Sequence, residues 1–319
     1  MEKTDTRPPF AASGGIIPPE LRKIKTPCYV LDEAALIKNA ELMGKIAEKT
    51  GCKMLLAQKA FSNYDCYHLL EPYLAGTEAS GLYEARLGAQ EMPGKEVHVF
   101  CAGYREDEFE ELLCFADHIV FNSPSQLLRF GKRAKQAGKS VGLRINPECS
   151  TQEGHEIYDP CAPGSRMGTT RAQWEAAVKM HPDLTGLLDG IHFHTLCEQD
   201  SSDLETTLAA VKVKFGDLIS QVKWLNLGGG HHITRPGYDI ARLEKCIEAA
   251  KEEWKVDIYL EPGEAWALNA GFFLTTVLDV LQNGDTRLAI LDGSAACHMP
   301  DVLEMPYRPP LLGADEPGK

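Results

Sequence analysis

From about residue 36 onward, the chain alternates short apolar runs with longer segments of helical periodicity. Eight of these runs are typical of β-strands, namely Met54–Ala57, Gly76–Ala79, Val97–Phe100, His118–Phe121, Val141–Ile145, Asp189–His194, Trp224–Leu227 and Asp257–Leu260. The intervening segments, among them Ser123–Ala137, Ser202–Phe215 and Ile240–Trp254, are each long enough for one helix. Strands that alternate with helices predict a parallel sheet. Eight such units predict an α/β fold with a closed (β/α)8 TIM-like barrel, and a doubly wound open sheet is the second choice.

Three further strand-like runs lie outside the barrel segment, namely Pro27–Leu31, Phe272–Leu281 and Arg287–Leu291. Because they bracket the barrel in sequence, we expect them to form one β-rich domain from both chain ends. The predicted parts are an N-terminal segment 1–35 of the β-rich domain, a barrel over 36–264, and a C-terminal β-rich part over 265–319. Residues 300–319 hold five prolines and no strand-like run, so we expect the β-rich domain to be incomplete.

Composition and charge argue against nucleic acid and membranes as partners. The 46 acidic residues outnumber the 33 basic ones, and the net charge of -13 disfavours binding to nucleic acid or anionic lipid. No apolar run reaches the roughly 18 residues of a membrane helix. The first twenty residues carry charges and prolines where a signal peptide needs an apolar stretch. The ten cysteines form no C-x-x-C pair, so we expect reduced thiols in a cytoplasmic protein.

The residues that follow the strands are the candidates for chemistry, because βα barrels place their active sites at the carboxyl ends of the strands. Lys59 follows the first barrel strand, where partial desolvation would lower the pKa of its amine and favour a Schiff base. A solvated surface lysine is the commoner alternative. Three glycines, Gly228, Gly229 and Gly230, follow the seventh strand. Their backbone N–H groups would cradle a phosphate, unless the loop is only a turn.

Histidines and charged residues end other strands. His192 and His194 are two residues apart, so their side chains share one face of a strand. They would bind a metal together with further ligands, or one would stack on a cofactor ring; a buried, hydrogen-bonded histidine is the commonest alternative. Glu261 begins the sequence E-P-G-E and would need a cationic or protonated partner such as a pyridinium N–H, unless it is a turn acid. Glu78 and Arg144 complete the ring of charged strand-end residues.

An amine, a phosphate cradle, a stacking imidazole and an acid for a ring nitrogen together describe pyridoxal 5'-phosphate, and we expect no metal. In their order along the chain, these residues resemble the fold-type III, alanine-racemase-fold decarboxylases, which include ornithine, arginine and diaminopimelate decarboxylases. The resemblance implies that Lys59 binds the cofactor covalently and that His194 stacks on its ring. It further implies that the loop Gly228–Gly230 holds the phosphate and that Glu261 pairs with the pyridine nitrogen. Glu78 and Arg144 are assigned to the same cofactor site.

The residue after E-P-G indicates which members of this decarboxylase family the chain resembles. Ornithine-type enzymes have Arg there, whereas this chain has Glu264, and the segment His298–Pro310 is similar to the carboxynorspermidine/carboxyspermidine decarboxylases. That similarity implies a carboxy-lyase of polyamine biosynthesis that forms norspermidine or spermidine and carbon dioxide. Glu264 and Asp301 would bind the substrate amines, with Arg308 also in the substrate site. The family also implies a homodimer with shared active sites, and it places a catalytic Cys–Asp pair and a phosphate-binding Tyr in C-terminal sequence without a counterpart here.

Three alternatives stay open at this point. The first is a decarboxylase of the same fold that acts on diaminopimelate or another basic amino acid. The second is a metal-dependent barrel hydrolase that uses His192 and His194. The third is a noncatalytic protein that binds pyridoxal phosphate and releases no carbon dioxide from any amine.

Overall fold

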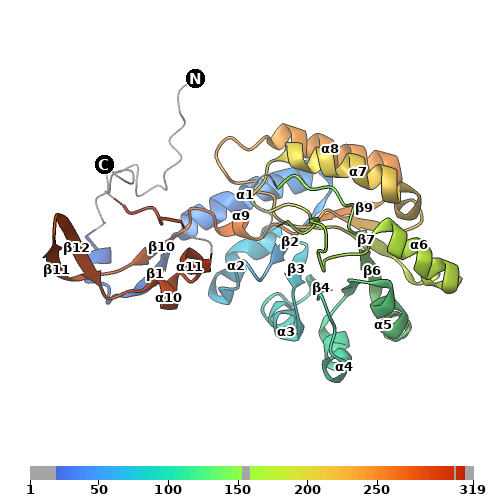
Figure 1. Ribbon diagram of the computed structural model, residues 1–319, viewed down its shortest axis with the longest axis horizontal. Coiled ribbons are helices and arrows are strands. Elements are labelled where there is room, and N and C mark those ends of the chain that lie inside the picture. Colours follow the sequence, from blue (N-terminus) through green and yellow to red (C-terminus); the bar gives the residue numbers. More distant parts are fainter. Residues whose placement is uncertain (1–18, 153–158, 305–306, 313–319) are drawn as a thin grey trace. The chain divides into compact units, whose positions relative to one another are not determined.

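The computed structural model describes residues 19–152, 159–304 and 307–312. In it, eight parallel strands close into a barrel in chain order, as predicted (Figure 1). The strands are β2 (Lys53–Ala57), β3 (Gly76–Ala79), β4 (Glu96–Phe100), β5 (His118–Phe121), β6 (Ser140–Arg144), β7 (Gly190–His192), β8 (Trp224–Asn226) and β9 (Asp257–Leu260). The first and last strands pair in parallel through Lys53 and Tyr259, so the sheet is closed and the open-sheet alternative is wrong.

Helices lie on the outside of the barrel (Figure 1). The longer ones are α1 (Glu33–Thr50), α3 (Leu82–Glu91), α4 (Glu106–Phe115), α5 (Pro124–Gln136), α6 (Arg171–Met180), α7 (Ser201–Ile219) and α8 (Ile240–Trp254). The short ones are α2 (Tyr67–Leu70), α9 (Glu264–Ala267) and the 3-10 turns Tyr64–Cys66, Glu71–Tyr73 and Pro182–Leu187. Of these, α1 precedes the first barrel strand, α9 follows the last one, and the others connect consecutive strands. Side-chain caps fix several starts: Ser123 accepts from the third residue of α5, and Asp200 forms a capping box with Asp203 in α7. None of the described helices is long and apolar enough to cross a membrane.

A layer of bulky side chains fills the barrel interior. Leu55, Val120, Trp224 and Tyr259 form one buried cluster there. A Cβ atom on Gly190 would lie 1.9 Å from Cδ2 of Trp224. The indole therefore fits only because its neighbouring strand carries glycine at that position, and its Nε1 donates to Oγ of a serine on β6 at 2.9 Å.

The chain divides into two compact units, Leu36–Leu268 on one side and Met1–Ala35 with Asn269–Lys319 on the other. In the second unit, both chain ends meet: β1 (Cys28–Leu31) pairs antiparallel with β10 (Gly271–Leu274). A separate hairpin joins β11 (Val277–Asn283) to β12 (Thr286–Leu291). The short helices there are α10 (Ala295–His298), α11 (Asp301–Glu304) and the 3-10 turn Leu21–Lys23. Parts of the predicted terminal segments, residues 1–18, 305–306 and 313–319, lie outside the described residues.

The prediction of one strand over Phe272–Leu281 was wrong, because the chain leaves the β conformation between β10 and β11. Thr276 marks the break. Its N–H donates to Oδ1 of Asp292 at 2.9 Å, and its carbonyl accepts from the N–H of Asp292 at 3.1 Å. These bonds tie Thr276 to the end of the hairpin, a contact between distant residues that the apolar run does not reveal.

We expect Gly190→Ala to destabilise the barrel by about 1–3 kcal/mol, because the added methyl group overlaps the indole of Trp224. The matched control is Gly186→Ala, since a Cβ atom at that exposed position meets no atom within 4 Å. Urea unfolding of both variants measures the difference. Equal free energies of unfolding in the two variants would contradict this account of the interior.

Candidate active site

Lys59 lies in the turn after β2, at the carboxyl end of the barrel, and its side chain is exposed. Within the described part of the chain, its ammonium forms no hydrogen bond or ion pair. The turn itself is held firmly. The N–H of Gln58 donates to the carbonyl of Glu78 at 3.1 Å, and its amide donates to the carbonyl of Glu84 at 2.8 Å. A fixed backbone thus presents an amine that is available for bonding.

Glu261, directly after β9, is a buried carboxylate with a partner for each oxygen. Nε2 of His192 lies 3.1 Å from Oε2, and Nδ2 of Asn226 donates to Oε1 at 2.7 Å. Burial opposes ionisation, but the attraction and hydrogen bond of His192, with the charge of Lys59, lower the pKa of Glu261 to about 2. Burial also lowers the pKa of His192. A neutral imidazole therefore donates from Nε2 to an ionised carboxylate.

Glu78, on β3, is the second buried carboxyl group of this end. Burial, followed by repulsion from the charge of Glu261, raises the pKa of Glu78 to about 8. Its Oε2 has no hydrogen-bond partner among the described residues. At neutral pH the site therefore holds one ionised and one protonated carboxyl group, a division of roles that enzymes use for acid–base work.

Arg144 ends β6 and brings a buried positive charge to the same end of the barrel. Nη2 donates to the carbonyl of His194 at 3.0 Å, and the guanidinium carbon lies 4.5 Å from the ring centroid of Phe100. Burial lowers the pKa of Arg144 to about 10, so the group stays charged at neutral pH. The ring of Phe100 also stacks on His192, with centroids 5.5 Å apart. One aromatic ring thus supports both a cation and an imidazole.

The glycine loop is built for close approach between segments that follow neighbouring strands. A Cβ atom on Gly228 would lie 2.3 Å from the carbonyl oxygen of Phe193, and one on Gly230 would lie 2.0 Å from that of Leu196. Both glycines also have positive φ angles, 72° and 78°. Only glycine satisfies these two requirements together.

Two of the three loop N–H groups already donate within the chain. The N–H of Gly228 donates to Oδ1 of Asn226 at 2.9 Å, and that of Gly229 donates to Nδ1 of His194 at 3.2 Å. Because Nδ1 accepts, the proton of the His194 ring is on Nε2, and burial lowers the pKa of this residue well below its usual range. The loop therefore orients the imidazole, while its contact with a phosphate stays a prediction.

The expected substrate residues fall into different units. Glu264 begins α9 with a half-exposed side chain, and its Oε1 lies 3.6 Å from Nε2 of His232. Asp301 and Arg308 are exposed residues of the other unit, where Asp301 accepts from the hydroxyl of Tyr307 at 2.6 Å. Their roles toward a substrate stay predictions.

Two residues of the site were not predicted from the sequence: Asn226, which donates to Glu261, and Phe100, whose ring lies against Arg144. Asn226 lies two residues before Gly228, and Phe100 lies two residues after His98. Because strand side chains alternate, this spacing would have placed both side chains inside the barrel. The same geometry leaves one alternative open, since His192, His194 and Glu261 also offer three metal-binding atoms within 4.8 Å of one another.

Comparison with known proteins decides the class. No family model matches the chain. It is 41% identical over 292 residues to the carboxynorspermidine/carboxyspermidine decarboxylase of Campylobacter jejuni, covering 92% of this chain and 74% of that relative. It is 40% identical over 300 residues to the carboxyaminopropylagmatine decarboxylase of Synechocystis, covering 94% and 76%.

Solved structures agree. The carboxynorspermidine decarboxylase of Campylobacter jejuni complexed with norspermidine superposes with a TM-score of 0.81 at 39% identity, covering 89% of this chain and 72% of that one. Diaminopimelate decarboxylase of Helicobacter pylori shares the fold, with a TM-score of 0.75 at 20% identity, covering 89% and 74%. The barrel and its relatives define a fold-type III decarboxylase. Within that class, the chain belongs to the carboxynorspermidine/carboxyspermidine decarboxylase family.

We expect Glu78→Gln to change how stability depends on pH. With a pKa near 4.5 in the unfolded chain and about 8 in the folded one, Glu78 keeps an extra proton in the folded state between these values. The contribution of this proton to the free energy of unfolding is fully present below pH 4.5 and is lost as the pH rises through 8. The loss is at most about 1.4 kcal/mol per pH unit. Glutamine removes this loss.

Urea unfolding from pH 5 to 8.5 measures the effect, with Glu91→Gln at an exposed site as the matched control. The parent and the control both retain Glu78, so their free energies of unfolding should fall together as the pH rises. The free energy of unfolding of Glu78→Gln should fall less. A parent curve that runs parallel to that of Glu78→Gln would contradict the raised pKa of Glu78.

Proposed function

We propose that this enzyme uses pyridoxal 5'-phosphate to decarboxylate carboxynorspermidine and carboxyspermidine, which yields norspermidine or spermidine and carbon dioxide. The observation that carries the proposal is the amine of Lys59, which has no hydrogen bond or ion pair with any described residue and lies at the same barrel end as the buried, ionised Glu261. The 41% identity to a carboxynorspermidine/carboxyspermidine decarboxylase also supports the proposal.

The residues present fit this cofactor. An ionised carboxylate has about four lone-pair sites, so Glu261 retains acceptor capacity for a pyridinium N–H beside its bonds to His192 and Asn226. A Cβ atom on Gly229 would lie 2.4 Å from the carbonyl oxygen of Glu261 and 3.1 Å from Cε1 of His194, so glycine lets the loop pass close to both residues. Bound here, pyridoxal phosphate would supply an electron sink for the negative charge left by the loss of carbon dioxide.

Each proposed cofactor residue has one task. Lys59 would hold the cofactor through its amine, and Glu261 would hold the ring nitrogen. His194, fixed by its bonds to Gly229 and Arg144, would cover the ring face. The loop Gly228–Gly230 would hold the phosphate, and the protonated Glu78 would supply a hydrogen-bond donor nearby.

The proposed substrate site is acidic where the substrate is cationic. Glu264 would attract an amine of the substrate at the barrel mouth, and Asp301 would bind a second amine farther along the chain. Arg308 completes this site in the proposal. Carboxylates accept strong, short hydrogen bonds from ammonium groups, which favours a polyamine over a neutral amino acid.

We infer a homodimer with shared active sites. The hairpin of β11 and β12 supports this inference, because its side chains are exposed and many are apolar, including Val280 at 46% and Ile290 at 45% exposure. An exposed apolar strand pair is the kind of surface that a second copy covers.

A second substrate has a specific observation in its favour. The relative named for carboxyaminopropylagmatine is 40% identical and matches 94% of this chain, almost the same similarity as the first relative. That compound ends in a guanidinium group, which two carboxylate oxygens bind side by side. Diaminopimelate is less favoured, since its decarboxylase from Haemophilus influenzae is only 24% identical.

We expect purified protein with pyridoxal phosphate to be yellow and to release carbon dioxide from carboxynorspermidine. Lys59→Ala should lose both properties, and Lys59→Arg, which keeps the charge but not the nucleophilic amine, should lose them too. Absorption spectra and trapped carbon dioxide measure this for carboxynorspermidine, carboxyspermidine, carboxyaminopropylagmatine and diaminopimelate in parallel. Colour without gas from carboxynorspermidine or carboxyspermidine would refute the substrate, and no colour would refute the cofactor.

We expect Asn226→Asp to lower kcat by about 100-fold, because a donor to Glu261 becomes a second carboxylate. The repulsion raises the pKa of Glu261, so the acid limb of the kcat profile should move to higher pH. Asn39→Asp is the matched control, since this amide donates only to backbone carbonyls. A pH profile of Asn226→Asp identical to that of the control would show that Asn226 does not set the charge of Glu261.

A further inference from the structure

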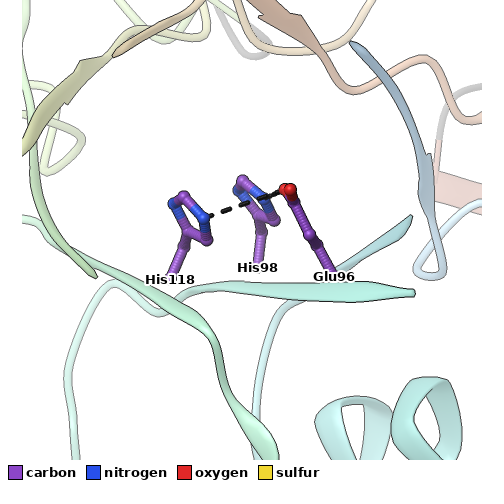
Figure 2. A group of neighbouring side chains, drawn as sticks. All are labelled: Glu96, His98 and His118. Atoms are coloured by element: carbon purple, nitrogen blue, oxygen red, sulfur yellow. Dashed lines mark hydrogen bonds and ion pairs between the residues drawn. The ribbon is translucent and has the colours of Figure 1, made fainter. Parts of the chain in front are cut away.

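A second polar cluster lies at the opposite, amino-terminal end of the barrel. Glu96 begins β4, and His98 follows two residues later on the same face of the strand. His118 begins β5 and is the register partner of His98. The alternation of strand side chains therefore brings all three into the barrel interior, where Figure 2 shows the two imidazoles side by side next to the carboxylate.

The donor atoms of this cluster converge. Nε2 of His98 lies 2.9 Å from Oε2 of Glu96, and Nε2 of His118 lies 3.8 Å from the same oxygen. All three atoms lie within 4.8 Å of one another. Donors around a tetrahedral zinc ion are roughly 3.3 Å apart, so small side-chain movements reach that spacing.

The two imidazoles also lack partners for their remaining nitrogens. Nδ1 of His98 and Nδ1 of His118 are buried without a hydrogen bond to any described residue. The side chain of His118 makes no hydrogen bond within the described ranges, although only 13% of it is exposed. An ion bound by the two Nε2 atoms would leave both Nδ1 atoms to water. The atom that points to an ion is Nε2 of His118, which at 3.8 Å from Oε2 of Glu96 is beyond hydrogen-bond distance.

Lys53 and the stacking of the two rings determine how an ion could be bound. Lys53 donates to Oε1 of Glu96 at 3.2 Å and to the hydroxyl of Tyr259 at 2.7 Å, so it occupies the other carboxylate oxygen. The rings of His98 and His118 are stacked, 3.9 Å apart and 8° from parallel. Because an imidazole lone pair lies in the ring plane, one ring must turn to share an ion with the other. His118 is the more exposed of the two, with 13% of its side chain exposed against 1% for His98.

We propose that Glu96, His98 and His118 bind one divalent transition-metal ion of the zinc class, with water at the open coordination position. Two imidazoles and one carboxylate are a typical donor set for such an ion. The ion would join β4 to β5 at the end of the barrel away from the candidate active site. Its role there is structural, since this end of a βα barrel serves stability.

The test is isothermal titration of the pyridoxal-phosphate-loaded enzyme with zinc chloride. We expect one ion per chain at this cluster, and His118→Gln and Glu96→Gln should each weaken its binding by at least about tenfold. Lys53→Met should strengthen binding, because it removes the competing cation. His194→Gln reports on the other histidine–glutamate cluster, and it should leave this ion in place.

Circular dichroism establishes that each variant is folded. No binding at tens of micromolar zinc, or undiminished binding in folded His118→Gln, overturns the proposal. If both ligand variants fail to fold, crystals of the parent enzyme soaked in zinc decide the matter. An anomalous peak among the three side chains supports the site, and its absence overturns it.

Discussion

The buried charge of Glu261 is the interaction on which the carboxyl end of the barrel depends. A carboxylate withdrawn from water is costly unless donors compensate it. Here two neighbouring strands supply them, His192 from β7 and Asn226 from β8. Burial, together with repulsion by the same charge, keeps Glu78 protonated. The buried anion thus presents a fixed negative site to whatever binds above it.

Alternation along the strands explains why such groups are inside the barrel at all. Inward positions recur at every second residue, so β4 directs Glu96, His98 and Phe100 to the interior, and β9 directs Tyr259 and Glu261 there. The apolar members fill the middle, and the polar ones gather toward the two ends. The strands therefore carry two separate polar clusters.

Much of the barrel could be predicted from sequence, because each strand and helix has its own local pattern. The position of Lys59 after the first strand and of Glu261 after the last one followed directly from that count. Contacts between distant residues could not be predicted in the same way. The bond from Asn226 to Glu261, the use of two glycine N–H groups within the chain, and the break at Thr276 all depend on partners that a local pattern does not specify.

The tightly packed layer around Trp224 has a consequence for the movement of protons. Leu55, Val120, Trp224 and Tyr259 are at most 3% exposed and fill the middle of the barrel. Such a layer fills the middle of the barrel with buried side chains and so separates its two polar ends. Solvent and protons that reach the carboxyl end then come through its own opening rather than along the barrel axis. Any acid that protonates a reacting carbon there must approach from that side, and the residues around the opening control which acid does so.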